Sequence, residues 1–366
     1  MKKKVAFFMR SAQGGGAERV MISVANSFLE KGHDVDFIFV HAEGPFIKEI
    51  HKNVNVVDLK SKRAIYSLFK FYFYLLKNKP DTLISALNYI NLIAIFSCFF
   101  IIFNKPKVIV TEHGTLSAVT KDLEGTGKIV PKLMKLLYPY AQKIVCVSNG
   151  VADDLAEQLN IDRGSIVTIY NPINFEDINN KKNLPLAYPW VETDIPIILG
   201  AGRLVDVKNF PLLINAFLKV RAKVNCRLVI IGEGEKRKDL EHLIATSSFS
   251  DDILLYGFTD NPYQWMKAAK VFVLSSNTEG LPTVLIEALA CGAKVISTDC
   301  PYGPREILDN GRYGALVEVG NIDELASTIV NSLTDNMQNS SRISFDKYRP
   351  ESVFENYEKV ISDEKK

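Results

Sequence analysis

The sequence predicts two α/β domains in tandem, each built on a doubly wound parallel sheet. Short apolar runs rich in β-branched and aromatic residues alternate with helix-length amphipathic segments, as they do where buried parallel strands are joined by helical crossovers. This alternation stops once, near residue 172, and then restarts. The length of 366 residues also suits two domains of roughly 150–200 residues better than one hydrophobic core.

The first domain, residues 1–172, contains six predicted strands separated by helices. The strands are short and mostly apolar: Val5–Met9, Val35–Val40, Val54–Leu59, Thr82–Ser85, Val108–Thr111 and Ile144–Val147. Helical length and periodicity are found at Ala17–Glu30, Ala64–Lys77, Tyr89–Phe103 and Gly150–Leu159. The apolar stretch Ile90–Phe103 is shorter than the roughly 20 residues that cross a bilayer, so we expect a buried helix there.

A linker is predicted at residues 173–196, which are rich in Pro and Asn and show no sustained period. The second domain, residues 197–349, repeats the alternation. Its predicted strands are Ile197–Gly200, Leu228–Ile231, Ile253–Leu255, Val271–Leu274 and Val295–Ser297. Its predicted helices are Asn209–Val220, Lys236–Ala245, Pro282–Ala290 and Ile322–Leu333. A final helical segment, about 350–366, could pack back onto the first domain.

Charge is balanced over the chain but not along it. The sequence has 44 Lys and Arg against 42 Asp and Glu, which argues against a nucleic-acid binder that works through bulk charge. Residues 1–170 hold 22 basic and 15 acidic side chains, a net charge of +7, and the remainder holds 22 and 27, a net charge of −5. This asymmetry indicates either different partners for the two domains or simple compositional drift.

Cysteine and histidine spacing predicts neither disulfides nor a metal site. The five Cys form no C-x-x-C pair, and the five His show no H-x-x-x-H spacing. The Lys-rich start is followed by only a short apolar run that ends at Arg10, so no signal peptide is expected. We therefore expect a cytoplasmic protein with reduced thiols and without cofactor or metal.

Candidate binding residues were sought just after the strands, because ligands of open parallel sheets bind beyond the strands' carboxyl ends. Gly14, Gly15 and Gly16 follow the first strand and open a helix, whose free N–H groups suit a phosphate. The run is neither G-x-G-x-x-G nor a P-loop, and it is equally typical of a tight turn. His113 also follows a strand. It is either a neutral hydrogen-bond partner or general acid/base, or a structural residue.

Two cations and two carboxylates follow strands of the second domain. Arg203 and Lys208 could converge on one dianion, or belong to a solvated basic loop. Glu279 and Glu287 lie eight residues apart and flank the free N–H groups of a predicted helix start near Leu281–Val284, where they could accept bonds from sugar hydroxyls. Glu287 could also be a solvated helix residue, although its neighbours are almost all apolar, which makes an unpaired carboxylate costly.

Taken together, these motifs resemble the retaining glycosyltransferases of family 4. The most specific feature is the Glu-x7-Glu element, embedded in Glu279-Gly280-Leu281-Pro282 and followed by Ala290-Cys291-Gly292. The supporting features are Gly200-x-Gly202-Arg203 with Lys208, Ile231-Gly232-Glu233-Gly234, Gly257-Phe258, Val147-Ser148-Asn149 and the Gly14–Gly16 turn. They occur in the family's order from about residue 4 to 335. The resemblance implies the GT-B fold, in which two Rossmann-like domains face a central cleft.

The resemblance also implies roles for individual residues. The N-terminal domain would bind the acceptor and the C-terminal domain the nucleotide-sugar donor. Arg203 and Lys208 would bind the donor diphosphate and neutralise the charge that develops on the leaving group. Glu279 would contact the transferred sugar, together with the backbone of Gly280, Leu281, Pro282 and Thr283. Glu287 would bind the ribose, and Gly257 and Phe258 would hold the base. Gly15 and Gly16 would lie near the diphosphate or the acceptor, and His113 would bond to a hydroxyl of the donor sugar.

A closer similarity is carried by Asp299-Cys300-Pro301-Tyr302-Gly303-Pro304-Arg305-Glu306, with Tyr170-Asn171-Pro172. This stretch is similar to bacterial enzymes that add hexose or N-acetylhexosamine to lipid-linked or surface glycans, which commonly use UDP-sugars. The similarity implies a polyprenyl-diphosphate-linked acceptor and no metal or protein nucleophile. The basic first half would then either touch an anionic membrane, placing the protein at the inner face of the cell membrane, or be an ordinary basic surface.

Three other functions are weighed against a transferase. A UDP-sugar epimerase on the same fold needs acid/base carboxylates at the sugar ring, and the flanking motifs fit transferases better. A dinucleotide oxidoreductase is disfavoured because G-x-G-x-x-G is absent. A non-catalytic sugar-nucleotide binding subunit is disfavoured by the intact set of Arg203, Lys208, Glu279 and Glu287.

Overall fold

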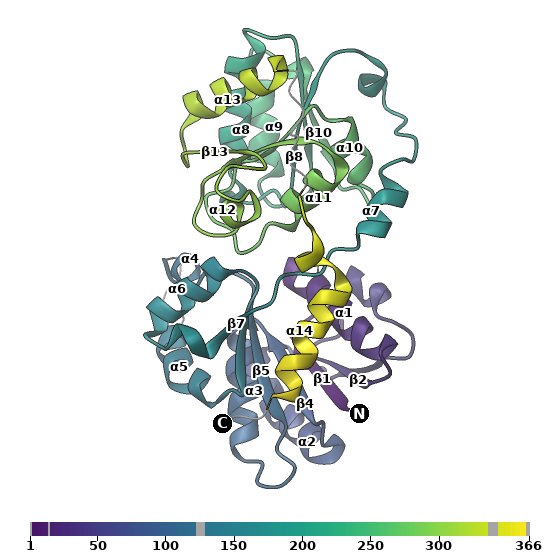
Figure 1. The fold of residues 1–366 in the computed structure, drawn as a ribbon, viewed down its shortest axis with the longest axis vertical. Coiled ribbons are helices and arrows are strands. Elements are labelled where there is room, and N and C mark those ends of the chain that lie inside the picture. The colour runs from purple at the N-terminus through teal and green to yellow at the C-terminus, as the bar shows by residue number, and fades with distance from the viewer. Residues whose placement is uncertain (1, 14, 122–128, 336–342, 364–366) are drawn as a thin grey trace. The chain divides into compact units, whose positions relative to one another are not determined.

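The chain divides into two compact units, one comprising Met1–Pro172 with Phe345–Lys366 and the other Ile173–Ser344 (Figure 1). The structure is a computed structural model that describes residues 2–13, 15–121, 129–335 and 343–363. Each unit contains one parallel sheet flanked by helices, which confirms the predicted fold class. Among the described residues, no helix combines the length and apolar character that crossing a bilayer requires.

The first unit is built on a seven-stranded parallel sheet with the order β3-β2-β1-β4-β5-β6-β7. Its strands are β1 (Lys4–Met9), β2 (Asp34–Phe39), β3 (Asn55–Asp58), β4 (Thr82–Ala86), β5 (Lys107–Glu112), β6 (Lys143–Cys146) and β7 (Ile166–Thr168). This is the Rossmann order extended by one strand. The extra strand β7 was not predicted, because three residues are too few to show a period.

Adjacent phenylalanines of β1 show how helices cover both faces of this sheet. Neighbouring strand residues point to opposite faces. Phe7 packs edge-on against Phe28 of α1 (Gly16–Glu30), with ring centroids 6.0 Å apart, whereas Phe8 stacks at 3.9 Å on Phe71 of α2 (Leu68–Asn78). Helices α1 and α2 therefore lie on opposite faces of the sheet.

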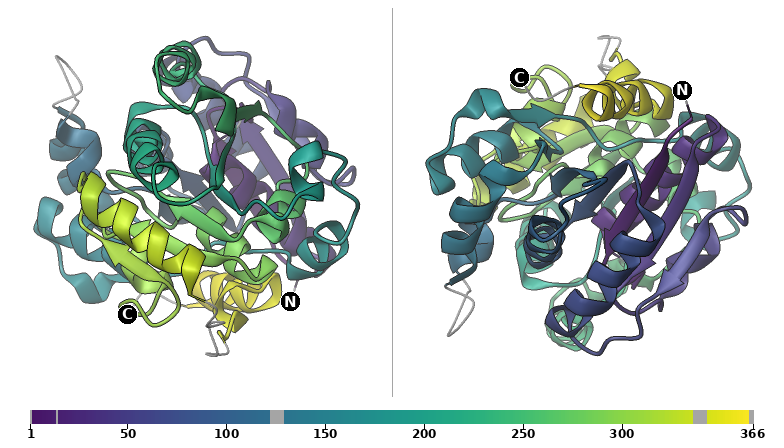
Figure 2. Two further views of the ribbon diagram at one scale, coloured as in Figure 1. Left: turned by 90° about the horizontal axis from the view of Figure 1, so that it is seen from above. Right: turned by 90° about the horizontal axis from the view of Figure 1, so that it is seen from below.

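The C-terminal helix α14 (Pro350–Ser362) shares the face of α1. Phe354 of α14 lies 5.0 Å from the Phe28 ring and is buried in the same hydrophobic core. The Lys3 ammonium also donates to the carbonyl of Ile361 at 3.2 Å, and both views of Figure 2 show the yellow helix beside the purple N-terminal segments. The last part of the chain thus completes the core of the first unit.

The opposite face carries α2, α3 (Asn88–Phe99) and α5 (Val130–Leu137), which pack side by side. Helix α3 ends at Phe99 rather than at Phe103 as predicted, because the chain turns back through Asn104, in the left-handed region, to begin β5. Residues 102 and 103 are exposed rather than buried. The unit also contains α4 (Leu116–Lys121) and α6 (Asn149–Leu159).

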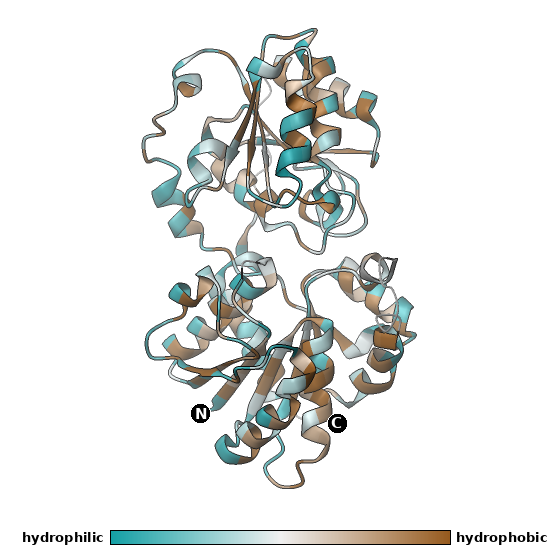
Figure 3. Cartoon of the chain, turned by 180° about the vertical axis from the view of Figure 1, so that it is seen from behind, coloured by the Kyte–Doolittle hydropathy of each residue, from teal (hydrophilic) through white to brown (hydrophobic). Residues whose placement is uncertain are grey.

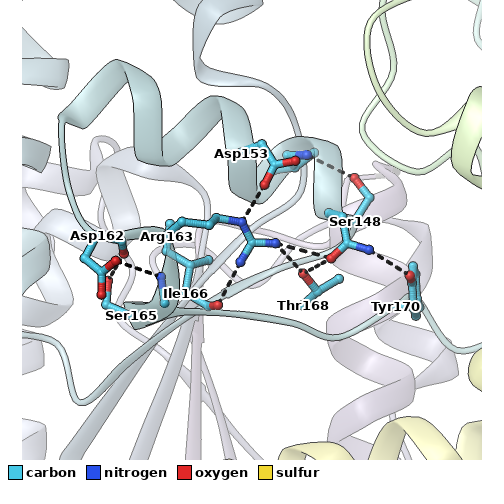
Figure 4. A network of polar contacts seen from close by, with 11 residues as sticks. Ser148, Asp153, Asp162, Arg163, Ser165, Ile166, Thr168 and Tyr170 are labelled. Atoms are coloured by element: carbon cyan, nitrogen blue, oxygen red, sulfur yellow. Dashed lines mark hydrogen bonds and ion pairs between the residues drawn. The ribbon is translucent and has the colours of Figure 1, made fainter.

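A polar network holds the carboxyl ends of β6 and β7 together (Figure 4). Arg163 donates to Asp153 at 2.6 Å, to the Ile166 carbonyl at 3.0 Å and to Asn149 at 3.2 Å. Asn149 also accepts from Thr168 at 2.9 Å, and Ser148 caps α6 by accepting from the Val151 amide. The Val147-Ser148-Asn149 element therefore has a structural role here.

The second unit is built on a six-stranded parallel sheet with the order β10-β9-β8-β11-β12-β13. Its strands are β8 (Ile197–Ala201), β9 (Arg227–Ile231), β10 (Ile253–Gly257), β11 (Val271–Leu274), β12 (Lys294–Thr298) and β13 (Ala315–Val317). Its helices are α7 (Phe175–Lys181), α8 (Phe210–Arg221), α9 (Arg237–Ala245), α10 (Tyr263–Ala268), α11 (Thr283–Cys291), α12 (Pro304–Ile307) and α13 (Ile322–Thr334).

The segment 173–196, expected as a linker, packs on the second unit. Helix α7 lies against α10 and α11, and the Lys182 ammonium donates to the Ala290 carbonyl at 3.0 Å. Further along, Tyr188 packs on the buried Trp265, and the Arg227 guanidinium lies 4.8 Å from the Trp190 ring centroid. Aromatic contacts, hydrogen bonds and the packing of α7 therefore hold this Pro-rich stretch on the domain, although its sequence shows no helical or strand period.

Candidate active site

The candidate site of the second unit lies where the strand order reverses. Strands β8 and β11 are neighbours in the sheet, but their crossovers run outward in opposite directions. The loops that follow them, residues 202–209 and 275–282, therefore meet at one carboxyl edge. This switch point is where open parallel sheets bind ligands.

Lys208 and Glu279 meet at this edge. The Lys208 ammonium lies 2.5 Å from Glu279 Oε1, and the Ser276 hydroxyl donates to the same oxygen at 2.6 Å. Both side chains are largely shielded, with 21% of Lys208 and 10% of Glu279 exposed. Since both bonds end on Oε1, Glu279 Oε2 accepts none from the described residues and is available to a ligand hydroxyl.

Main-chain contacts fix the two loops that carry this pair. The Ser275 hydroxyl donates to the Lys208 carbonyl at 2.9 Å, and the Asn277 amide donates to the Val207 carbonyl at 2.8 Å. Thr298, at the end of β12, donates to the Ser276 carbonyl at 2.6 Å. The geometry of the pair is therefore set by three neighbouring strand ends rather than by the two side chains alone.

The N-terminus of α11 opens beside Glu279. Pro282 precedes the helix, and the first amides, from Thr283 onward, have no earlier carbonyl of the same helix to bond. Gly303, with φ of +80°, packs on this turn. A Cβ there would lie 2.7 Å from Pro282 Cδ and 2.8 Å from the Gly280 carbonyl oxygen. This close approach shapes a helix N-terminus that can receive an anion.

The other predicted residues of the second unit lie around this pair. Arg203 follows β8 and is exposed, and its guanidinium makes no hydrogen bond to the described residues. Glu287 lies half-buried on α11, one turn before Cys291, whose pKa rises to about 12 through burial, with the Glu287 charge adding to the effect. The structure thus joins Lys208 to Glu279 directly and places Arg203 and Glu287 on the elements that flank them.

At the exit of β10, a glycine precedes an exposed aromatic residue. Gly257 has φ of +91° and its carbonyl accepts from the Gly232 amide at 2.9 Å. Gly232 itself faces the Gly202 carbonyl oxygen so closely that any side chain there would collide with it. Phe258, which follows Gly257, is 72% exposed, so its ring is available for stacking.

In the first unit, His113 is held as a neutral imidazole. Burial lowers the pKa of His113 to about 4. Its Nε2 lies 3.0 Å from the Thr111 hydroxyl, and that hydroxyl donates its single hydrogen to the Ser85 carbonyl at 2.9 Å. We infer that Nε2 carries the proton and donates to Thr111, which leaves Nδ1 as an acceptor. Nδ1 is buried and has no partner among the described residues, so it can accept from a ligand hydroxyl.

A second carboxyl group lies next to His113. Glu112 ends β5, is 4% exposed and accepts from Asn91 at 2.9 Å and from the Tyr138 hydroxyl. Burial raises the pKa of Glu112 to about 7 despite these two donors. Asn91 also donates to the Thr111 carbonyl at 3.0 Å, so the network holds the end of β5 against α3.

The glycine turn is described only in part. Gly15 is the residue before α1 and Gly16 begins the helix, so their amides lie at its N-terminus. A Cβ on Gly15 would collide with the Glu18 carboxylate, whereas one on Gly16 would meet nothing within 4 Å. Gly14 lies outside the described residues.

Sequence reasoning assigned no role to Ser276, Thr298 or Glu112. Ser276 is the second residue after β11 and stands three residues before Glu279. This position at a strand exit is the sequence feature that could have marked it as a site residue. Thr298 acts from a strand that is 22 residues away in sequence, and nothing local marks it. Glu112 was passed over in favour of its neighbour His113, because burial at a strand end cannot be read from one residue.

Known protein families and individual proteins are similar to this chain over most of its length. The family model described as glycosyl transferases group 1 matches residues 190–352, and the model described as glycosyltransferase family 4 matches residues 14–177. A Campylobacter jejuni N-acetylgalactosamine-N,N'-diacetylbacillosaminyl-diphospho-undecaprenol 4-α-N-acetylgalactosaminyltransferase is 32% identical over 91% of this chain and 91% of its own length. A second C. jejuni enzyme, an α-1,4-N-acetyl-D-galactosaminyltransferase named for a PP-undecaprenol-linked acceptor, is 30% identical over 88% of this chain and 86% of its own.

Solved structures share the two-sheet fold. Anabaena HepE in complex with UDP matches with a TM-score of 0.80 and 18% identity over 98% of this chain and 99% of its own. A glycosyltransferase from Rickettsia africae matches with a TM-score of 0.80 and 20% identity over 99% of this chain and all of its own. At these identities the likeness establishes the fold.

Proposed function

The chain belongs to glycosyltransferase family 4, and on that premise we propose that it moves a hexose or N-acetylhexosamine from a UDP-sugar to a hydroxyl of a polyprenyl-diphosphate-linked glycan, with retention of anomeric configuration. Glycosyl transfer is the activity of the family. The donor, acceptor and stereochemistry are the proposal. The observation that carries it is the Lys208–Glu279–Ser276 cluster beside the N-terminus of α11.

The cluster supplies what a departing nucleoside diphosphate needs. The Lys208 ammonium has three N–H donors and spends one on Glu279, so two remain for phosphate oxygens. The exposed Arg203 adds a forked donor, and the first amides of α11 add a third source of positive potential. Together they stabilise the negative charge that grows on the leaving group. The proton of the acceptor hydroxyl then passes to the departing phosphate, so that no protein nucleophile is required.

Glu279 and Glu287 orient the donor. Glu279 Oε2 accepts from a hydroxyl of the transferred sugar, with the backbone of Gly280, Leu281, Pro282 and Thr283 beside it. Glu287 accepts from the ribose hydroxyls, and Gly257 with the exposed Phe258 holds the base. These roles rest on the family resemblance together with the positions of the residues at one sheet edge.

On the first unit, His113 accepts a hydrogen bond from a sugar hydroxyl through Nδ1. The orphaned, buried Nδ1 supports this role, because a buried acceptor without a partner costs stability that a ligand can restore. The α1 amides near Gly15 and Gly16 meet the diphosphate or the acceptor.

The relatives support the choice of substrates. Two C. jejuni enzymes at 30–32% identity are named for undecaprenol-linked acceptors, and the Anabaena structure of the same fold contains UDP. A lipid-linked acceptor would also bring the chain to a membrane surface, in keeping with the net charge of +7 in residues 1–170.

A donor screen tests the proposal. The protein is incubated with UDP-glucose, UDP-galactose, UDP-GlcNAc or UDP-GalNAc, with and without a polyprenyl-diphosphate-linked glycan. We expect acceptor-dependent UDP release with one donor, and an α-linked product by NMR. Absence of UDP release in every combination, or a β-linked product from an α-donor, would contradict it.

The same screen separates the alternatives. A UDP-sugar epimerase would change the donor without any acceptor, which chromatography of the remaining nucleotide sugar detects. A non-catalytic subunit would bind UDP, which calorimetry measures, but it would not form UDP from any of the UDP-sugars.

A further inference from the structure

We propose that the outer surface of α2, α3 and α5 is a docking face that seats the first unit on an anionic phospholipid bilayer. The apolar face is defined here as the exposed apolar residues of α2, α3 and α5, of the turn 100–103 and of the turn 138–140 that follows α5. The inference rests on the proposed function only in that a lipid-linked acceptor gives membrane docking a use. Its own evidence is the distribution of apolar and basic side chains over the described residues of the first unit.

Helix α2 is apolar on both sides. Its inner side buries Phe71 and Leu75. Its outer side presents Phe69, Phe73 and Leu76, which are 73%, 64% and 39% exposed. These positions are spaced i, i+4 and i+7 and so form one stripe along the helix. An apolar stripe on the outer side of a helix calls for a second apolar environment beyond the core that its inner side already covers.

Helix α3 and the turn after it extend the stripe. Phe96, Phe99 and Phe100 are 40%, 38% and 59% exposed, and residues 102 and 103, Ile and Phe, are each 84% exposed. The Tyr72 hydroxyl of α2 lies 3.5 Å from the Phe100 carbonyl, so the turn after α3 adjoins α2.

Helix α5 completes the surface on the other side of α3. Leu133 and Leu136 of α5 are 40% and 62% exposed and lie three residues apart on one face of the helix. Tyr140, in the turn after α5, is 57% exposed. The Tyr140 ring lies 4.7 Å from the Phe99 ring. The apolar face is therefore continuous over three helices, and Figure 3 shows hydrophobic residues running along the helices of this unit. A continuous exposed apolar surface of this kind marks an interaction site.

Lys residues frame this face, and the described residues that form it include no Asp or Glu. Helices α2, α3 and α5 together with residues 100–105 contain five Lys and no Asp or Glu, although the exposed Asp81 follows α2. Lys77, Lys105 and Lys132 are exposed, and the Lys105 ammonium lies 5.5 Å from the Phe99 ring centroid. Aromatic side chains favour the boundary between headgroups and acyl chains, and Lys favours anionic headgroups.

This charge pattern selects a bilayer over a second copy of the chain. In a symmetric dimer each copy presents the same patch to the other, so these uncompensated cations would face one another. An anionic bilayer neutralises them while it receives the aromatic side chains. The face thus has the chemistry of a protein that lies on one leaflet.

Vesicle sedimentation tests the proposal. The full chain is mixed with vesicles of phosphatidylcholine alone or with 30% phosphatidylglycerol, and the bound fraction is measured. We expect at least tenfold tighter binding to the anionic vesicles. The double variant Phe69→Ser/Phe73→Ser should weaken that binding at least tenfold. The charge reversal Lys77→Glu/Lys132→Glu should remove the preference for phosphatidylglycerol.

Matched controls come from the second unit. Leu184 and Val319 are exposed apolar residues there, at 53% and 37%, so Leu184→Ser/Val319→Ser should bind vesicles as wild type does. Lys223 and Lys238 are exposed lysines of the same unit, so Lys223→Glu/Lys238→Glu should keep the preference for phosphatidylglycerol. Circular dichroism melting of every variant checks that the fold is retained.

Three outcomes would overturn the docking face. The first is that the wild type does not bind anionic vesicles. The second is that the control variants lose as much vesicle binding as the apolar-face variant. The third is that the wild type forms a concentration-dependent dimer, which Phe69→Ser/Phe73→Ser dissociates, and does not bind vesicles. UDP binding by calorimetry is measured on the same samples. Vesicle binding without UDP binding would contradict the proposed function but support the docking face. UDP binding without vesicle binding would contradict the docking face and leave the proposed function standing.

Discussion

The two units place a carboxylate at the carboxyl edge of similar sheets but give it opposite surroundings. Glu279 in the second unit is held by the Lys208 ammonium and by Ser276, close to a helix N-terminus. Glu112 in the first unit is buried among neutral donors, Tyr138 and Asn91, and burial raises its pKa to about 7. The comparison shows that the partners of such a carboxylate, rather than its position on the fold, set its surroundings, and the proposed function gives a ligand-binding role only to the one that is paired with a cation.

The largest expected effect comes from breaking the charged cluster of the second unit. Glu279→Gln and Lys208→Ala should each lower kcat/KM for transfer by about 100–1000-fold, because each removes a group that stabilises or orients the donor in the transition state. The fold should persist, since both side chains lie at the sheet edge and not in the core. Steady-state UDP release measures the rates.

The pair Lys219–Asp323 provides a control for these two variants. Its nitrogen and oxygen atoms are also 2.5 Å apart, but it is exposed, at 49% and 81%, on α8 and α13. Lys219→Ala and Asp323→Asn should leave transfer unchanged. If they reduced it as much as the cluster variants do, the site assignment would be wrong.

The next largest effect concerns Glu112 and is one of stability. Its folded pKa of about 7 lies above the ordinary value of 4.5, so the folded state binds more protons between these pH values and the Glu112 contribution to stability falls as pH rises through them. Glu112→Gln removes this dependence. As the pH rises from 4.5 to 7.5, the unfolding free energy of the variant should therefore increase by about 3 kcal/mol relative to that of the wild type. Urea unfolding followed by circular dichroism measures the difference.

Tyr138→Phe sharpens the same comparison. The Tyr138 hydroxyl stabilises the ionised carboxylate of Glu112, so its loss should move the midpoint of the pH effect upward. An unfolding free-energy difference between Glu112→Gln and wild type that stays constant with pH would show that folding leaves the pKa of Glu112 unshifted, and the contrast with Glu279 would not hold.

His113 should have an intermediate effect on transfer. His113→Ala removes one hydrogen bond to a neutral ligand group, which is worth about 1–1.5 kcal/mol, so kcat/KM should fall about tenfold. Because the pKa of His113 is lowered to about 4, it stays neutral above pH 5 and contributes no inflection to the wild-type rate profile between pH 5 and 8. His242→Ala, an exposed histidine on α9, should behave as wild type. A wild-type inflection near pH 6.5 that His113→Ala removes would contradict the neutral assignment.

The smallest expected effect is at Ser276. Ser276→Ala leaves Lys208 on Glu279 and removes one of two bonds to Oε1, so transfer should fall only several-fold. Ser275→Ala is the neighbouring comparison. It loosens the Lys208 main chain without touching Glu279. A larger activity loss in Ser275→Ala than in Ser276→Ala would show that loop position matters more than the bond to the carboxylate.

Much of the fold was predictable because buried parallel strands leave a local signature. The apolar runs at Val5–Met9 and Val271–Leu274 became β1 and β11 with little change. The short strands β7 and β13 were missed, because three residues show no period. Helix α7 was missed because its Asn-rich sequence reads as a linker, and it is packing on α10 and α11 that holds it.

The sequence by itself determined which side chains follow which strands, and that was enough to predict Lys208 and Glu279 at one sheet edge, since the carboxyl ends of parallel strands lie together. Only the tertiary structure decided that these two residues, 71 positions apart, would bond through one oxygen with Ser276. It also decided that Glu112 would be buried and that α2 would show Phe69 and Phe73 to the outside. The physical reason is that hydrophobicity and charge belong to single residues, whereas burial depends on what the rest of the chain packs against them.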